Sequence, residues 1–244
     1  MLVFWPLYIV GDNLFLPHTC VKMELFAMNL DAARENMIEC QLRTNKITDG
    51  RILNAMATIP RERFVPPGRE EFAYTDVDIP CGEGRYLMAP MAVARLIQEA
   101  ELKAENAVLC VGAGTGYAVS VLAKLADSVI ALESDPHCCK TAGELFSELS
   151  FDNAVLVEGD LRRGWRKESP YDVIFIDGMV SKVPDELLDQ LSMGGRLVGI
   201  VDSGDGVGHA TVYIRLENSV SSRRIFDINV GFLPEFDKNQ EFVF

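Results

Sequence analysis

The sequence is short of positive charge and has no pair of cysteines spaced to hold zinc. Lys and Arg number 23 against 36 Asp and Glu, which gives a formal net charge of −13. Such a chain repels a phosphate backbone, and no basic stripe interleaved with aromatic residues offsets this, so we expect no nucleic-acid partner. The six cysteines form no CxxC pair. This argues against a metal site and a disulfide framework, and it favours a reducing cytoplasm.

Long apolar runs are also missing. The first ten residues, MLVFWPLYIV, are apolar but include Pro6, and so short a segment cannot cross a bilayer as a regular helix. It also lacks the positive start and the cleavage site of a secretory signal. We therefore expect no membrane association. We expect the native chain to start at Met23 or Met28, with residues 1–22 as a loosely held extension.

A chain of 244 residues suits one α/β domain with a modest appendage. We expect an N-terminal extension over residues 1–30, a helical and substrate-side segment over 31–100, and a cofactor-binding α/β domain over 101–244. The last two segments should form one compact unit. The sequence leaves the oligomeric state open.

The N-terminal third has helical periodicity. Residues 31–46 predict an amphipathic helix with Asp31 as its N-cap, a second helix follows Asp49, and Pro90 opens a third. The segment between the second and third helices contains turn residues that indicate loops, namely Pro80, Gly82 and Gly84.

From Ala107 onward, short apolar runs alternate with helical segments, which is typical of a parallel sheet covered by helices on both faces. The expected strands are AVLCVG, SVIALE, AVLVEG, YDVIFIDG and GRLVGIV, and helices are expected over 116–126, 136–149 and 184–191. After Val201 two segments of period two, GDGVGHATVYIRL and RRIFDINVGFL, predict an antiparallel pair with the glycines in a turn.

Three glycines follow the first of these strands and precede a helix. In VLCVGAGTGY, Gly112, Gly114 and Gly116 let a ligand approach the backbone and the helix N-terminus, although a tight strand-to-helix connection would use the same residues. Glu133 ends the next strand, where a carboxylate can accept hydrogen bonds from ribose hydroxyls, and Asp160 ends the third, where a carboxylate can face an adenine edge. The compact GxGxG spacing favours S-adenosylmethionine over a dinucleotide.

Six blocks in order resemble the protein-L-isoaspartate (D-aspartate) O-methyltransferase family over nearly all of residues 31–234: ILNAMATIPRERFVP, AYTDVDIPCGEGRYLMAPMAVARL, VLCVGAGTGYAVSVLAKLA, VEGDLRRGW, PYDVIFIDG and LLDQLSMGGRLVGIV. The resemblance implies a class I methyltransferase fold, an α/β Rossmann-like sheet, mostly parallel, with a C-terminal antiparallel hairpin and an N-terminal helical segment. It also implies S-adenosylmethionine as cofactor and methylation of isoaspartyl carboxyls in damaged proteins or peptides. The implied cofactor residues are Gly112, Ala113, Gly114, Thr115, Gly116, Tyr117, Glu133, Ser134, Asp160, Leu161 and Asp177, and the implied substrate-side residues are Tyr86, Leu87, Ala89, Pro90 and Met91.

Three positions depart from the family pattern. Met88 and Met91 stand where the family carries a Ser and a His, and Cys110 replaces an acidic residue of the glycine motif. By position Met88 is the catalytic candidate, yet a thioether lacks the hydroxyl donor, and apolar packing under a loop is the alternative interpretation. Two further hypotheses stay open: a sibling methyltransferase with another acceptor, and a cofactor-binding pseudoenzyme that acts by interaction.

Overall fold

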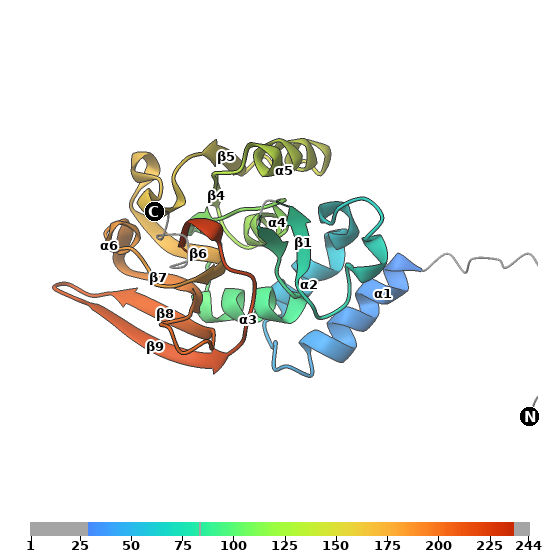
Figure 1. The fold of residues 1–244 in the computed structure, drawn as a ribbon, viewed down its shortest axis with the longest axis horizontal. Helices are drawn as coiled ribbons and strands as arrows, with labels where there is room; N and C mark the ends of the chain where they lie inside the picture. The colour runs from blue at the N-terminus through green and yellow to red at the C-terminus, as the bar shows by residue number, and fades with distance from the viewer. Residues whose placement is uncertain (1–28, 83, 237–244) are drawn as a thin grey trace, which may run out of the picture.

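The computed structural model describes residues 29–82 and 84–236. Its centre is a seven-stranded sheet with the strand order β5-β4-β3-β6-β7-β8-β9 (Figure 1). The strands are β3 (Ala107–Val111), β4 (Ser128–Glu133), β5 (Ala154–Glu158), β6 (Tyr171–Val180), β7 (Leu191–Val201), β8 (His209–Arg215) and β9 (Val220–Asp227).

The first five of these strands are parallel, and β8 and β9 each run antiparallel to their neighbour. The α/β sheet with an antiparallel finish that the sequence predicts is therefore confirmed. The strand order reverses between β3 and β6. Ligands of open α/β sheets bind at such a switch point, outside the carboxyl ends of the strands.

Helices cover both faces of the central strands, which is why β3 and β6 are almost wholly buried and apolar. Along β3, Val108 and Cys110 join the core cluster that contains most of the buried apolar residues of α3, α4 and α5. Leu109 and Val111 join the opposite cluster, which includes Leu187 of α6. The helices are α1 (Leu30–Asn36), α2 (Gly50–Thr58), α3 (Pro90–Ala100), α4 (Tyr117–Ala123), α5 (Pro136–Glu148) and α6 (Asp185–Leu188).

Several element boundaries differ from those expected. Asn29, not Asp31, caps α1, because its side-chain oxygen accepts from the Ala32 amide at 3.0 Å. A π-helix, Met37–Leu42, continues α1 directly. Both α4 and α6 are shorter than predicted, and α6 gives way to β7, which starts at Leu191 because that residue pairs with Tyr171 of β6.

A short hairpin replaces the loops expected around Pro80, Gly82 and Gly84. Its strands are β1 (Ile79–Gly82) and β2 (Arg85–Leu87), which form a separate two-stranded sheet. Gly82 and Gly84 have φ of +101° and +73°, values that glycine adopts without strain, so the residues that indicate a loop also allow a tight turn here. The hairpin places Arg85 at the start of β2.

After β9 the described chain returns to the middle of the sheet instead of extending the last strand. β9 stops at Asp227, so the strand expected over RRIFDINVGFL is too long. Residues 230–236, here called the C-terminal strap, then lie beside β6 (Figure 1), where Phe232 forms a parallel bridge with Met179. The amide of Leu233 donates to the Met179 carbonyl at 2.9 Å. The strap ends in the 3-10 turn Pro234–Phe236.

The expectations for residues 1–22, Met23 and Met28 lie outside the described residues. In the part that the structure describes, five cysteines are free thiols. None of the helices described there is long and apolar enough to cross a membrane.

Candidate active site

The glycine turn lies between β3 and α4, as the sequence predicts. Gly112, Gly114 and Gly116 have φ of +77°, +53° and +95°, a left-handed backbone region that side-chain-bearing residues rarely adopt. A hydrogen bond holds the turn to the segment around Phe64: the Thr115 hydroxyl donates to the Phe64 carbonyl at 2.7 Å.

Glu133 ends β4 directly beside this turn. Its side chain is fully buried, and its Oε2 accepts from the Gly114 amide at 2.8 Å. Its Oε1 accepts from the amides of Ser134 and Asp135 at 2.7 and 2.9 Å. Three backbone donors therefore hold the carboxylate at the carboxyl edge of the sheet, the place expected for a group that binds ribose.

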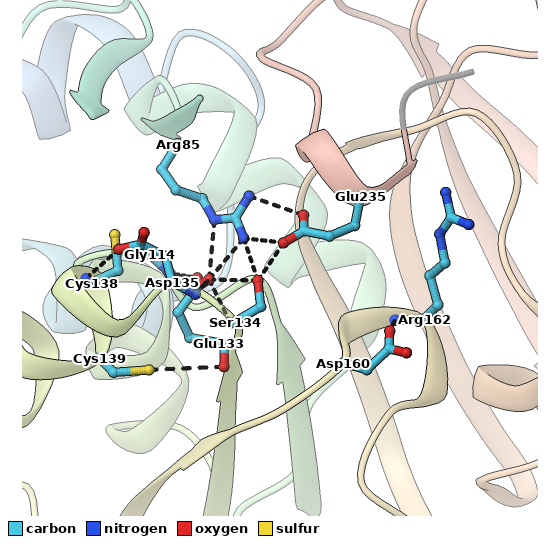
Figure 2. Close-up of polar contacts among 10 residues, drawn as sticks. All are labelled: Arg85, Gly114, Glu133, Ser134, Asp135, Cys138, Cys139, Asp160, Arg162 and Glu235. Carbon is cyan, nitrogen blue, oxygen red and sulfur yellow. Dashed lines mark hydrogen bonds and ion pairs between the residues drawn. The ribbon is translucent and has the colours of Figure 1, made fainter. Parts of the chain in front are cut away.

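Arg85 of β2 also reaches this carboxylate. Its Nε and Nη2 donate to Oε1 of Glu133 at 3.1 and 2.9 Å, and Nη1 and Nη2 donate to the two oxygens of Glu235 at 3.0 and 2.6 Å (Figure 2). Glu235 also accepts from the Ser134 hydroxyl. Burial alone would lower the pKa of Arg85, but the hydrogen bonds and charges of the two carboxylates raise it above its ordinary value.

Asp177 lies within β6, one residue after Ile176, which pairs with Val111 at the end of β3, and this places it next to the glycine turn. Its Oδ1 is buried and has no hydrogen-bond partner among the described residues. Burial raises the pKa of Asp177 to about 8, against the opposing charge of Arg61. Burial likewise raises the pKa of the neighbouring Cys110 thiol, so Cys110 stays neutral and supplies no fixed negative charge.

The substrate-side residues are held by side chains from other segments. Met88 is buried, with 1% of its surface exposed, and its carbonyl accepts from Arg61 Nη2 at 2.6 Å. The Ala89 amide donates to Asp78 at 2.8 Å. Of the other predicted positions, Leu87, Ala89 and Pro90 are buried, Met91 is half-buried and Tyr86 is exposed.

Not every predicted residue joins the cluster around Glu133. Ser134 belongs to it, but Asp160 lies on a separate loop (Figure 2), where it accepts from the Arg162 amide at 2.9 Å. Asp160 is exposed and Leu161 after it is buried. Tyr117 is buried beneath the guanidinium of Arg61, which lies 4.5 Å from the ring centroid.

Sequence reasoning missed four charged residues that organise the site: Arg61, Asp78, Arg85 and Glu235. Arg61, Asp78 and Arg85 stand inside blocks that carry the family resemblance, so a charged residue within those blocks was a usable signal. For Glu235 the sequence contained no such signal, because its partner Arg85 is 150 residues away in sequence. Within the described residues no three His, Cys, Asp or Glu side chains form a group that could hold a metal ion.

Comparison with known proteins agrees with the fold and with the resemblance. A sequence profile of the protein-L-isoaspartate(D-aspartate) O-methyltransferase family matches residues 32–240. The chain belongs to this family. A protein-L-isoaspartate O-methyltransferase 1 of Syntrophobacter fumaroxidans is 36% identical over 187 residues, which cover 77% of this chain and 86% of that protein. A protein-L-isoaspartate O-methyltransferase 2 of Shewanella sediminis is 42% identical over 166 residues, 68% of each chain.

Two solved structures of the family share the fold. One protein-L-isoaspartate O-methyltransferase superposes with a TM-score of 0.74 at 24% identity, covering 82% of this chain and 65% of that one. A Plasmodium falciparum structure described as a protein-L-isoaspartate O-methyltransferase in complex with S-adenosyl-L-homocysteine has a TM-score of 0.70 at 21% identity, covering 82% of this chain and 97% of that one. The expected class I methyltransferase fold is thereby confirmed. As a family member, the chain is an S-adenosylmethionine-dependent protein carboxyl O-methyltransferase.

Proposed function

We propose that this chain transfers a methyl group from S-adenosylmethionine to the free carboxylate of isoaspartyl residues in damaged proteins. The observation that carries the proposal is the pairing of Glu133 with the glycine turn, through the 2.8 Å bond from the Gly114 amide. Family membership indicates the type of reaction, and the position of Glu133 beside the turn is suited to binding the ribose of the cofactor.

The residues at the carboxyl edge of the sheet fit such a cofactor. The residues of the turn, 112–117, would leave the backbone open to it, and Glu133 with Ser134 would bind the ribose. Asp160 and Leu161 would lie beside the adenine. The buried Oδ1 of Asp177, which has no partner among the described residues, would be free to accept a hydrogen bond from the cofactor. When bound, the cofactor supplies a methyl group already activated on a sulfonium.

The protein's own task is then to position the acceptor. A peptide carboxylate with a pKa around 4 is ionised at neutral pH, so no general base is needed. Holding it in line with the methyl group can supply an effective molarity on the order of 10⁵ M or more. We infer that Tyr86, Leu87 and residues 88–91 form the acceptor side. Arg61 and Asp78 fix the backbone of this segment.

The reaction can be tested with a synthetic isoaspartyl peptide and labelled cofactor. We expect a methyl ester on the isoaspartyl peptide and none on the peptide of the same sequence with a normal aspartyl linkage. Mass spectrometry of both peptides measures this. Absence of ester on the isoaspartyl peptide at high enzyme concentration would refute the proposal.

A second candidate is a methyltransferase with a different acceptor, and the buried thioether of Met88 favours it. Met88 offers no hydroxyl donor where the family pattern has a serine. If the acceptor has changed, Met88→Ser should raise transfer to the isoaspartyl peptide, provided that circular dichroism shows the variant folded. Activity that is already present and unchanged in the variant argues against this candidate.

We also propose the organisation inferred from the sequence: residues 31–100 carry the acceptor side, and residues 101–244 carry the cofactor side. The free thiols of the described cysteines support a cytoplasmic location. Isoaspartyl-containing proteins or peptides are the proposed partners.

A further inference from the structure

Glu133, the carboxylate proposed to bind the ribose, already accepts hydrogen bonds from the protein itself. Oε1 of Glu133 accepts from the Ser134 and Asp135 amides and from two nitrogens of Arg85, and Oε2 accepts from the Gly114 amide. An ionised carboxylate has about four lone-pair sites. Oε1 thus faces these four donors for its two lone pairs, two of them from Arg85, and Oε2 faces one. A ribose diol therefore meets a carboxylate that Arg85 crowds and that has one free site, on Oε2.

The space beside the glycine turn is filled as well. A Cβ built on Gly112 would lie 2.8 Å from a methyl carbon of Leu233, and one built on Gly178 would lie 2.8 Å from Cγ of the same side chain. The room left by the missing side chain at the turn is thus taken by the C-terminal strap.

The strap is fastened at several points along its length. The Gly231 amide donates to Asp78 at 2.8 Å, and the Leu233 amide bonds to Met179 of β6. Glu235 bonds to Arg85 and to Ser134, both of which also contact Glu133 (Figure 2). One continuous network joins the strap, the β1–β2 hairpin and the cofactor carboxylate.

We propose that Arg85 and the C-terminal strap form a latch that competes with the cofactor for Glu133 and for the space over Gly112. This inference rests on the proposed function, because it concerns binding of the same cofactor. Cofactor binding exchanges the Arg85–Glu133 ion pair for bonds from ribose hydroxyls to Glu133, and it displaces Leu233 from the turn. Glu235 stays available as the carboxylate partner of the released Arg85. The latch weakens cofactor affinity, since each binding event must first open it.

Calorimetric titration with S-adenosylhomocysteine tests the latch in the full chain. Arg85→Gln removes the competing charge, and the Kd should fall at least tenfold relative to wild type. Arg196→Gln is the matched control, because Arg196 also has a carboxylate partner, Glu101 at 2.6 Å, at the opposite edge of the sheet. Its Kd should equal that of wild type. An unchanged or higher Kd for Arg85→Gln overturns the proposal.

Amide hydrogen exchange of the wild-type protein gives a second readout that does not depend on the variant folding. A simple binding site would slow exchange at every amide near the ligand. The latch predicts that added S-adenosylhomocysteine slows exchange at Gly114 but speeds it at Gly231 and Leu233, whose hydrogen bonds must open. Slower exchange at Gly231 and Leu233 overturns the proposal.

The two proposals fail in different ways. If the wild-type protein and Arg85→Gln bind S-adenosylhomocysteine equally, the latch is wrong and the methyltransferase function stands. If neither binds it, both are wrong. Methyl transfer to the isoaspartyl peptide is measured separately, so it does not enter this distinction.

Discussion

Arg61 and Met88 are joined by a 2.6 Å hydrogen bond from the guanidinium Nη2 to the main-chain carbonyl. Arg61 is fully buried, and its Nε donates to the Ala73 carbonyl, also at 2.6 Å. Burial lowers the pKa of Arg61 below its ordinary value. The charge is nevertheless kept in the interior, where it ties two loops of the acceptor side to the turn Arg61–Phe64.

Replacing this side chain should destabilise the protein. Arg61→Lys keeps the charge, but an ammonium cannot reproduce the two-pronged bond to Ala73 and Met88. We expect a loss of about 2–3 kcal/mol in the free energy of unfolding, the value of one hydrogen bond from a charged donor. Urea denaturation measures it. Arg51→Lys is the control, because Arg51 is exposed and pairs with Asp49 at the surface, and it should change stability by less than about 0.5 kcal/mol. Equal effects at the two positions would contradict the assigned role of Arg61.

The raised pKa of Asp177 makes a definite prediction for stability against pH. An unfolded aspartate titrates near pH 4, whereas folded Asp177 titrates near pH 8 because of burial. Between these values the folded state holds a proton that the unfolded state has lost, so stability falls as the pH rises, by up to about 1.4 kcal/mol per pH unit. Arg61 opposes this shift, and Glu133 and Asp78 add to it.

Asp177→Asn should remove that contribution. The variant should gain stability relative to wild type steadily from pH 5 to pH 8, measured by urea denaturation at several pH values. Asp152→Asn, at an exposed position, should run parallel to wild type. Parallel curves for Asp177→Asn would show that Asp177 is ionised in the folded protein throughout this range.

The sequence predicts the parts of this molecule that follow from local pattern. Apolar runs indicated the parallel strands, and glycine spacing with Glu133 at a strand end indicated the cofactor edge, because strand and turn chemistry act over a few residues. Arg85 shows the limit. Its two carboxylate partners lie 48 and 150 residues away, and no periodicity encodes such a meeting. The hairpin that carries Arg85 was equally hidden, since Gly82 and Gly84 serve loops and tight turns alike.

His209 gives a second prediction for stability against pH. A carboxylate with a lowered pKa loses its stabilising effect as the pH falls, whereas His209 should lose its effect as the pH rises. Its Nδ1 lies 2.7 Å from Asp227 and its Nε2 lies 3.1 Å from Asp205. Hydrogen bonds to Asp227 and then Asp205 raise the pKa of His209, while Arg224 opposes the shift. The stabilisation is therefore fully present below about pH 6.5, the unfolded value, and is lost as the pH rises through the raised folded value.

His209→Asn should lower the melting temperature most at pH 5.5. The difference from wild type should shrink as the pH rises above about 6.5. Thermal unfolding at pH 5.5, 7 and 8.5 measures it, and His137→Asn, at an exposed position, serves as the reference. A melting-temperature difference that stays constant with pH would mean that the His209 ion pairs contribute nothing.

Gly116 and Gly50 provide a matched pair for the glycine turn. Gly116 is the N-cap residue before α4, with φ of +95°, and a Cβ there would lie 2.6 Å from the ring of Phe146. Gly116→Ala therefore meets both backbone strain and a clash, and we expect a loss of at least about 2 kcal/mol in the free energy of unfolding. Gly50 is the first residue of α2, and a Cβ added there would have nothing within 4 Å. Gly50→Ala should stabilise the protein by about 0.4–1 kcal/mol. Chemical denaturation of the two variants compares the same substitution in two settings, and similar values would show that the turn carries no conformational constraint.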